Sequence, residues 1–468
     1  MPAPDAVTRA VDANFENSVA QLETLARIPS VSASGFDPAE VVRSADAVAQ
    51  LLEATGLTGV EVLRPGDAHP YVVAQWAGAS EDAPRVLLYS HHDVQPPGRL
   101  DQWRSPPFEP MRGADGRLYG RGVVDDKAGI VAHIAAITAW LETEGRLPVD
   151  LKIVVEGEEE IGSSHLRDFL LRYRERLDAD VIVLSDTANL ETGTPSLTTS
   201  LRGLVVVDVH VRALDHPLHS GMWGGAVPDA ATALTALLGR LVDAEGSPAV
   251  EGLEDDVPEP SPETRDRLAA LPFDAEAFRR DAGLPASARL LGRASQSVYE
   301  RLWLRPAIAI NALEAMPLAG AANQLIDRAS ARVGLRLAPG QDAERARDRL
   351  LEALQTDPPF GVEVRCEVKA ASGGWQTDAR GPAFDAAHRA LAAGYERAPI
   401  HIGCGGSIPF VGPFAEALGG VPALLLGLED PVCNAHGENE SLHLGDFRKS
   451  IHATAHLFAE LAATLSRG

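Results

Sequence analysis

The chain has 468 residues, of which 45% are hydrophobic and 23% charged, and its formal net charge of -24 opposes nonspecific binding to nucleic acid or anionic membranes. The N-terminal residues lack a basic stretch followed by an apolar run, and no segment is apolar over the roughly 18–20 residues that span a bilayer, so we expect a cytoplasmic protein. Its 3 cysteines are too few and too irregularly spaced for a disulfide framework or a thiolate zinc site.

The first half of the chain predicts alternating strands and helices. Apolar residues recur at helical spacing over 9–28, where Pro29 ends the pattern, and over 38–54, where Gly56 ends it. Short β-branched segments predict strands at 60–63, 71–76, 86–89, 151–155 and 181–184, with helices at 126–143 and 165–175. This order predicts a mixed, largely parallel sheet flanked by helices, with functional groups at the carboxyl ends of its strands.

The pattern changes near residue 198. Strands are predicted at 204–211, 329–337 and 362–368, helices at 226–242 and 342–354, and no clean period runs through 243–300. A hinge is expected at Ser372-Gly373-Gly374, after which a helix at 382–395, a strand at 421–426 and a helix at 446–465 resume the first style. We therefore expect an α/β catalytic domain, residues 1–197 and 373–468, with an inserted α+β lid and dimerisation domain at 198–372.

Possible metal ligands follow several predicted strands or open the next helix. They are His91 and Asp93 in LLYSHHDV, Asp125 and Asp126 in YGRGVVDDK, the glutamates of VEGEEEIGS, Asp186 in IVLSD, and His436 in NAHGENE. Each alone has an ordinary explanation as a solvated strand end, a helix-capping acid or an acidic turn. Together they offer nitrogen and oxygen ligands that suit zinc, with manganese as the alternative. The pattern favours a dinuclear metal site.

The segments YSHHDVQP, YGRGVVDDK, EGEEEIGSS, SDT and AHGENE resemble those of one metallopeptidase family. That family includes carnosinases, cytosolic nonspecific dipeptidases, acetylornithine deacetylase and succinyl-diaminopimelate desuccinylase. The likeness spans nearly the whole chain, and it is specific because five motifs occur in order. The segment HHDVQP, Trp103 with PPFEP at 106–110, and the large insertion favour the dipeptidase branch.

The resemblance implies roles for the motif residues. One metal would be held by His91 and Asp186, the other by Glu160 and His436, with Asp125 bridging the two, Asp93 supporting His91, and Glu159 acting as general base. The choice of Glu159 and Glu160 over Glu158 rests on aligning the glutamates before Ile161, so a shift by one residue stays open. The family also implies a cis peptide bond between Asp125 and Asp126.

The resemblance extends to the inserted domain. His219 in DHPLHSG is similar to a histidine that reaches the active site of a partner subunit, and Arg336 in VGLRL to an arginine that binds the substrate carboxylate. Asn323, Gly406 and Ser407 match positions that contact the substrate in the family. The ordinary alternatives are a surface histidine without a role for His219 and a plain turn for Gly405-Gly406-Ser407. The sequence departs from its relatives at two points. His92 replaces an aromatic or small residue, and residues 323–326 lack a proline. Both differences are expected to change the shape of the substrate pocket.

We expect the protein to be a zinc-dependent dipeptidase, in which metal-activated water cleaves short peptides that carry a free carboxylate. We also expect it to be a homodimer. An amidohydrolase that cleaves N-acyl or N-carbamoyl amino acids with the same metals is the nearest alternative. A metal-stabilised binding or scaffolding protein without catalysis is a third. Nucleophilic-serine and phosphate-loop enzymes are disfavoured because neither motif occurs in the sequence.

Overall fold

The computed structural model describes residues 2–465 except 79, 81, 407–410, 413 and 415–417. The chain divides into two compact units. The first comprises Met1–Thr199, Asp378–Ile402 and Phe410–Gly468, and the second comprises Ser200–Thr377 and Gly403–Pro409. None of the helices in the described part of the chain is long and apolar enough to cross a membrane.

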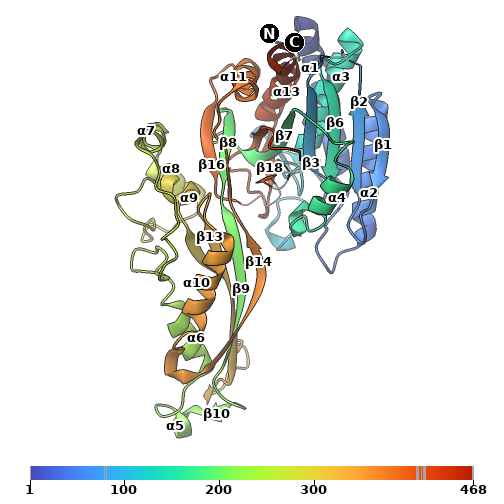
Figure 1. Ribbon diagram of the computed structural model, residues 1–468. Helices are drawn as coiled ribbons and strands as arrows, with labels where there is room; N and C mark the ends of the chain where they lie inside the picture. Colours follow the sequence, from blue (N-terminus) through green and yellow to red (C-terminus); the bar gives the residue numbers. More distant parts are fainter. Residues whose placement is uncertain are drawn as a thin grey trace. The chain divides into compact units, whose positions relative to one another are not determined.

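The first unit is a sheet covered by helices (Figure 1). Its helices are α1 (Asp5–Ala26), α2 (Pro38–Ala54), α3 (Lys127–Glu144), α4 (Leu166–Arg172), α11 (Pro382–Tyr395) and α13 (Leu444–Leu465), with 3-10 turns η1 (Leu100–Gln102) and η2 (Glu159–Ile161). Its strands are β1 (Thr58–Leu63), β2 (Tyr71–Trp76), β3 (Arg85–His91), β4 (Met111–Arg112), β5 (Arg117–Tyr119), β6 (Asp150–Glu156), β7 (Val181–Ala188), β17 (Ala423–Glu429) and β18 (Ser441–His443). Two further strands, β8 (Ser196–Leu201) and β16 (Ile400–Cys404), cross a unit boundary along the chain.

The main sheet has the order β1-β2-β6-β3-β7-β17-β8. The central strands β6, β3, β7 and β17 are parallel, whereas β1, β2 and β8 pair antiparallel with their neighbours. In this register His91 at the end of β3 faces Glu156 at the end of β6. The carboxyl ends of the parallel strands therefore meet at one edge, and this confirms the predicted mixed sheet with a parallel centre.

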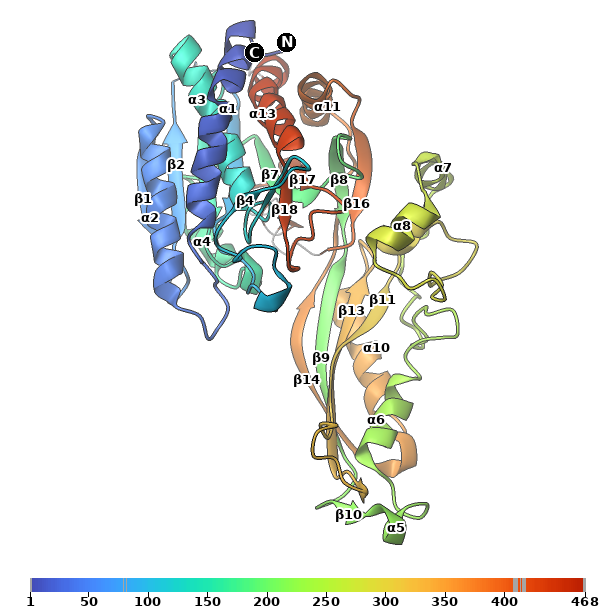
Figure 2. The same cartoon turned by 180° about the vertical axis from the view of Figure 1, so that it is seen from behind.

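Alternate residues of the central strands face opposite layers. Val86, Leu88, Ile153 and Val155 are buried in one core together with residues of α1, α2, α3, α11 and α13. Both ribbon views place α1, α3, α11 and α13 side by side over this face (Figures 1 and 2). On the opposite face the Tyr71 ring stacks on Phe169 of α4, with a centroid distance of 4.4 Å. The central strands are thus covered on both sides, and polar side chains collect at their ends.

The second unit is built on an antiparallel sheet of order β11-β13-β9-β14. Its strands are β9 (Gly203–Arg212), β10 (Leu218–His219), β11 (Ala307–Glu314), β12 (Gln324–Leu325), β13 (Arg328–Leu337), β14 (Glu363–Ser372) and β15 (Trp375–Gln376). Its helices are α5 (Ser220–Trp223), α6 (Ala230–Leu238), α7 (Pro262–Ala270), α8 (Ala275–Asp281), α9 (Val298–Trp303) and α10 (Ala343–Gln355), with the 3-10 turn η3 (Pro359–Gly361). Val205, Val207 and Val333 pack in one core with residues of α6 and α10. The other face of the sheet carries polar residues such as Asp208 and Arg332 beside the apolar Leu204 and Val206.

The predicted elements differ from the structure at several points. The helix expected at 38–54 has the same bounds, because Asp37 caps it by accepting a hydrogen bond from Ala39 N, with Pro38 as its first residue. The sequence analysis missed β8, β11 and β16, and the segment without a clean period holds α7, α8 and α9. The strand expected to end at residue 426 continues to Glu429, which brings one more carboxylate to the edge of the sheet.

Candidate metal centre

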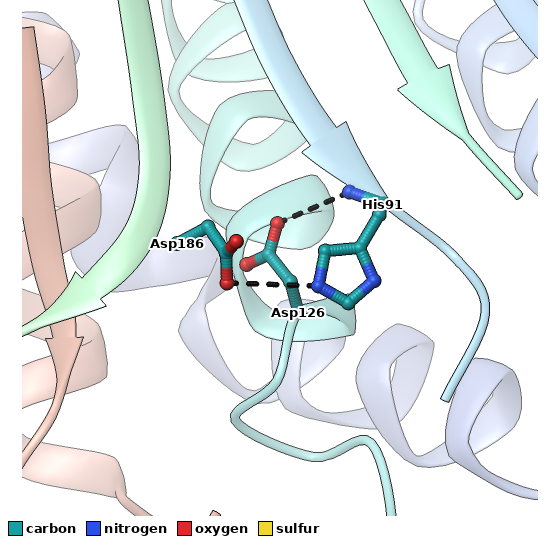
Figure 3. A group of neighbouring side chains, drawn as sticks. All are labelled: His91, Asp126 and Asp186. Atoms are coloured by element: carbon teal, nitrogen blue, oxygen red, sulfur yellow. Dashed lines mark hydrogen bonds and ion pairs between the residues drawn. The ribbon is translucent and has the colours of Figure 1, made fainter. Parts of the chain in front are cut away.

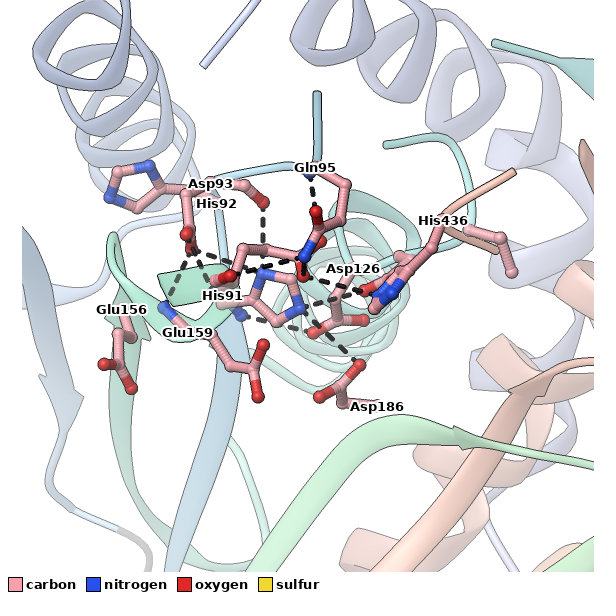
Figure 4. A network of polar contacts seen from close by, with 12 residues as sticks. His91, His92, Asp93, Gln95, Asp126, Glu156, Glu159, Asp186 and His436 are labelled. Carbon is pink, nitrogen blue, oxygen red and sulfur yellow. Dashed lines mark hydrogen bonds and ion pairs between the residues drawn. The ribbon is translucent and has the colours of Figure 1, made fainter. Parts of the chain in front are cut away.

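Side chains from six segments meet at the carboxyl edge of the main sheet. Figure 4 shows His91, Asp186 and His436 of this cluster. His91 ends β3, η2 follows β6 directly, Asp186 lies on β7, Asp125 precedes α3, Glu429 ends β17, and His436 lies in the loop before β18. The topology explains this convergence, since parallel strands end at the same edge. His91, Asp125, Glu160, Asp186 and His436, which are far apart in the sequence, are all brought into this cluster.

The carboxylate of Asp125 lies between the two imidazoles. Its Oδ1 is 3.0 Å from His91 Nε2, and its Oδ2 is 3.0 Å from His436 Nε2. Asp186 Oδ1 lies 3.6 Å from the same nitrogen of His91, and Glu160 Oε2 lies 3.3 Å from that of His436. The cluster therefore has two halves that share one carboxylate. The Asp125–Asp126 peptide bond is cis, as the resemblance implies.

Asp93 contacts residues of both halves of the cluster. His91 Nδ1 lies 3.1 Å from the carbonyl oxygen of Asp93 and 3.4 Å from its Oδ1, so Nε2 is the ring nitrogen that faces the cluster. The carboxylate of Asp93 also accepts hydrogen bonds from the backbone N–H groups of Glu159 and Glu160, at 3.2 and 3.1 Å, and from the Ser32 hydroxyl at 2.6 Å. One buried acid thus orients the histidine and holds the start of η2.

A buried ion pair joins the loops that carry Asp125 and His436. Arg121 donates from Nη1 to Glu440 Oε2 at 2.6 Å, and both side chains are almost fully buried. Glu440 Oε1 accepts from the backbone N–H groups of Val124 and Asp125, at 3.1 and 3.3 Å. Arg121 Nη2 donates to the carbonyl of His436 at 3.2 Å. This pair fixes the backbone on either side of the shared carboxylate.

The three consecutive glutamates after β6 point in different directions. Glu158 accepts hydrogen bonds from the Tyr71 hydroxyl and from His165 N, both at 2.9 Å, and so faces away from the cluster. Glu160 accepts from Gln95 Nε2 at 2.8 Å and reaches His436. Glu159 points its carboxylate toward Asp186 (Figure 4). Burial, followed by repulsion from Asp186 and Asp125, raises the pKa of Glu159 well above its ordinary value despite His91.

Two acids that the sequence analysis did not assign also belong to the cluster. Asp126 Oδ2 accepts a hydrogen bond from His91 N at 3.2 Å, and its carboxylate lies beside Asp186 and the His91 ring (Figure 3). Glu429 offers an oxygen within 4.8 Å of ligand atoms of Asp125 and Asp186. The sequence shows the pair Asp125-Asp126, but it does not show which of the two side chains faces the cluster. Glu429 follows an apolar segment, which is the same signal that identified the other acids and could have identified this one.

The donor set suits divalent metal ions. Burial and mutual repulsion raise the pKa values of Asp126, Glu160, Asp186 and Glu429, and no lysine or arginine within the described ranges forms an ion pair with them. Such crowded acids need a compensating cation. Two ligands bound to one zinc ion at about 2.0–2.1 Å lie roughly 3.3 Å apart, which matches the 3.0–3.6 Å separations within each half.

One of the remaining predicted residues, His92 of the first unit, packs away from this cluster. The His92 Nε2 lies 2.9 Å from the carbonyl of Pro70, and burial lowers the pKa of His92 to about 4, so it is a neutral packing residue. His219 and Asn323 belong to the second unit, where Ser220 N donates to the carbonyl of Asn323. His219 Nδ1 accepts from Gly221 N at 3.1 Å, which places the proton of a neutral ring on Nε2.

The last of these residues concern the expected substrate contacts. Arg336 lies on β13 opposite Leu204 of β9, and burial lowers the pKa of its guanidinium. Gly406 accepts a hydrogen bond from Arg202 N through its carbonyl. Ser407 lies outside the described residues. The substrate roles of these residues stay predictions.

Comparisons with known proteins agree with this chemistry. Residues 87–460 match the profile of peptidase family M20/M25/M40. The chain is 34% identical over 364 residues to the cysteinylglycine-S-conjugate dipeptidase of Corynebacterium striatum, covering 77% of each protein. It is 29% identical over 478 residues to a Cys-Gly metallodipeptidase of Schizosaccharomyces pombe, covering 98% of each. The crystal structure of human carnosine dipeptidase 1 aligns with a TM-score of 0.86 at 27% identity, over 99% of this chain and 100% of that one.

Proposed function

The chain belongs to peptidase family M20/M25/M40, and from this membership we propose that it is a dinuclear metallodipeptidase that hydrolyses dipeptides with a free C-terminal carboxylate. The observation that carries the proposal is the position of Asp125, whose two oxygens face two imidazoles from opposite ends of the chain. A carboxylate whose two oxygens face two separate halves can serve two neighbouring divalent ions at once. We infer zinc as the metal, with manganese as the alternative, because imidazole and carboxylate ligands suit both.

In the proposed site, His91 and Asp186 would hold one ion, His436 and Glu160 would hold the other, and Asp125 would serve both. When bound, such a pair would lower the pKa of a water toward about 7 and polarise the scissile carbonyl. Asp93 keeps His91 in the tautomer that binds through Nε2. Arg121 and Glu440 keep Asp125 in place.

Glu159 is the proposed general base. It has a buried carboxylate, its neighbours raise its pKa, and the Asp93 carboxylate accepts from its backbone N–H. A carboxylate at this position would accept a proton from the attacking water and return that proton to the departing amine. A neutral His219 with its proton on Nε2 would donate to the oxyanion that develops on the scissile carbonyl. Arg336 would bind the free carboxylate as a planar donor.

The direct test replaces Glu159 by Gln and compares it with Glu158→Gln, the same change one residue away. We expect kcat of E159Q to fall by about 10²–10⁴-fold, the range for lost general acid–base catalysis, with metal content unchanged. E158Q should keep its activity within a few-fold, since Glu158 faces Tyr71 and His165. Turnover and elemental analysis decide. An E159Q enzyme with wild-type turnover would refute the assigned base.

A panel of dipeptides, N-acyl amino acids and N-carbamoyl amino acids separates the two amide-cleaving activities. We expect the wild-type enzyme to cleave dipeptides with a higher kcat/KM than the acylated amino acids. Turnover of the acylated compounds alone would replace the dipeptidase by the amidohydrolase. The cytoplasmic location stays a prediction, which fractionation of cells that express the protein natively would test.

We further propose that the protein works as a homodimer through the β11 edge of the second unit's sheet. β11 and β14 are the two edge strands of this sheet, and Ile310 and Leu313 on β11 are 42% and 61% exposed. Leu318, after this strand, is 96% exposed. An apolar edge strand with unpaired backbone groups is suited to pairing with a second copy. By resemblance, the partner's His219 would then complete each active site.

Two measurements test the dimer. Leu313→Glu should shift the mass measured by light scattering from dimer to monomer and lower kcat while metal content holds. Leu171→Glu on α4, where Leu171 is 52% exposed, is the matched control and should change neither. Mixed dimers of a His219→Ala chain and a Glu159→Ala chain should regain partial activity, because one of the two sites would be intact. Confirmed mixed dimers without activity would contradict a shared site.

A further inference from the structure

A buried histidine of α3 contacts two strands that end at the candidate metal centre. His133 is 2% exposed, and its neighbours Ile134 and Ile137 belong to the apolar core. Its Nε2 lies 2.9 Å from the Ser185 hydroxyl of β7, and its Nδ1 lies 3.4 Å from the Ser90 hydroxyl of β3. No other described residue hydrogen-bonds with either hydroxyl. One ring therefore joins two neighbouring strands of the sheet.

Both serines come directly before residues of the metal cluster. Ser90 precedes His91, and Ser185 precedes Asp186. The parallel pairing of β3 with β7 ends one residue before the serine on each strand. Beyond that point the strands are joined through His133 and by the approach of His91 Nε2 to Asp186 Oδ1, at 3.6 Å. The ring thus lies between the last paired residues and the candidate ligands.

The helix that carries His133 also begins at the cluster. Asp126 caps α3 and lies about two helical turns before His133. Both residues contact β3, since Asp126 Oδ2 accepts a hydrogen bond from His91 N at 3.2 Å. Figure 3 shows the Asp126 carboxylate beside His91 and Asp186. His133 consequently connects three elements, α3, β3 and β7, that bring residues to the same half of the cluster.

The contact through His133 is one between neutral groups. A neutral imidazole has one N–H donor and one acceptor nitrogen, and a hydroxyl can donate or accept, so a single ring proton satisfies both serines. Burial lowers the pKa of His133 to about 3, which keeps the ring uncharged. The ring therefore adds no positive charge to offset the crowded acids. Its effect on the cluster is geometric.

We propose that His133 is a positioning residue for the metal centre: by joining Ser90 to Ser185, it sets the separation at which His91 and Asp186 bind one ion. The inference rests on the proposed two-ion centre, because bound ions are what require a fixed separation of these ligands. Groups that bind a metal must be held within about 0.5 Å of the productive geometry. A hydrogen-bonded bridge one residue before each ligand is well placed to hold them.

The test measures the affinity for each of the two zinc ions by competition with a chelator whose absorbance reports free Zn²⁺. His133→Leu keeps the bulk of the side chain but removes both ring nitrogens. We expect one ion to bind about 10-fold more weakly, at the low end of the range for groups that support metal ligands, and the other to change by less than a few-fold. His133→Gln should stay within a few-fold of wild type for both ions, because its amide also has a donor and an acceptor. Wild-type affinity for both ions in H133L would overturn the proposal.

A triple variant separates positioning from stability. H133L leaves two buried hydroxyls unpaired, which destabilises the fold. S90A/H133L/S185A removes the hydroxyls as well, and it should unfold in urea near the wild-type midpoint, because replacing all partners of a buried hydrogen bond by apolar groups is nearly neutral. It should nevertheless keep the weakened affinity for one ion. Wild-type affinity for both ions in the triple variant would assign His133 to the fold alone and overturn the proposal.

Trp140→Phe is the matched control on the same helix. Trp140 Nε1 donates to the carbonyl of Ala455 at 3.0 Å, so W140F also removes a buried hydrogen bond of α3, but one that contacts neither serine. It should lower the urea midpoint and leave both zinc affinities unchanged. A loss of affinity in W140F equal to that in H133L would show that any destabilised α3 weakens the centre, and this too would overturn the proposal.

The same measurements distinguish this inference from the proposed function. A wild-type protein that binds fewer than two ions would refute the two-ion centre and the role of His133 with it. A protein that binds two ions, loses affinity for one in H133L and cleaves no dipeptide would support the role of His133 and refute only the dipeptidase.

Discussion

Acids on the open sheet face of the second unit are paired with bases, whereas acids at the strand ends of the first unit crowd against one another. Asp208 accepts from Arg332 at 2.7 Å, and this hydrogen bond holds the pKa of Asp208 below its ordinary value. Burial and neighbouring carboxylates raise the pKa values of Glu159 and Glu160 instead. Among the described residues, Asp126, Glu160, Asp186 and Glu429 at these strand ends form no ion pair with a lysine or an arginine, whereas Asp208 pairs with Arg332.

This difference separates surface chemistry from a candidate reaction centre. Exposed acid–arginine pairs contribute little to stability and call for no ligand. Buried acids that share a space with histidines are costly unless a cation joins them, so the protein keeps such a cluster only where the bound ions offset that cost. The contrast yields tests in which the size of the effect should follow the degree of burial and crowding.

The largest effect should come from breaking the shared carboxylate. Asp125→Asn keeps the shape of the side chain but removes the charge that faces both His91 and His436. We expect kcat/KM to fall by at least about 10³-fold, because removal of the bridge disrupts both metal positions. Elemental analysis should show less than the wild-type metal content per chain. Full metal occupancy with wild-type turnover would contradict the bridging role.

The next effect should come from the buried pair behind the site. Glu440→Gln removes the charge that faces Arg121, and breaking a buried ion pair costs about 3–5 kcal/mol of stability. Urea unfolding of the metal-loaded protein measures the change. Tm should fall as well, and kcat should fall with it, because the loops that carry Asp125 and His436 lose a common anchor. If the free energy of unfolding fell by less than about 1 kcal/mol, the pair would contribute no more than an exposed ion pair, and its proposed role as an anchor would be wrong.

A smaller effect is expected at Glu429, which lies beside the ligands without facing an imidazole in the described structure. Glu429→Gln should weaken metal binding by about 10- to 100-fold, the range for groups that support metal ligands. Competition with a coloured chelator measures the affinity. Because the repulsion from Asp125 and Asp186 is relieved, the metal-free variant should unfold at a higher temperature than metal-free wild type. An unchanged affinity would remove Glu429 from the centre.

The smallest effect should come from the paired acid of the second unit. Asp208→Asn should cost about 0.2–1 kcal/mol at pH 7, as exposed pairs do. Because Arg332 lowers the folded-state pKa of Asp208 below 3.8, the pair stabilises the protein above that pH, and the contribution is lost as the pH falls through the lowered value. Urea midpoints of wild type and D208N should therefore converge in acid. A difference that persists there would show that the charge is not its source.

The sequence by itself determined the mixed sheet, the order of most elements and the donor types at the strand ends, because apolar periodicity and strand-end acids are properties of one local segment. The cis bond and the ligand roles came with the family resemblance. Sequence periodicity missed β11, and the expected strand at 421–426 stopped short of Glu429, since burial of these segments depends on strands that lie far away in the chain.

Only the tertiary structure decided which donors meet. Glu158 turns to Tyr71 while Glu160 turns to His436, and His92 turns to Pro70 while His91 faces Asp125. These neighbouring residues have the same chemistry, but their side chains point in opposite directions. The direction of each side chain depends on the backbone conformation and on the residues that pack against it. The partners of Glu440 and Asp208 are likewise decided across the fold, because Arg121 and Arg332 come from segments far away in the chain.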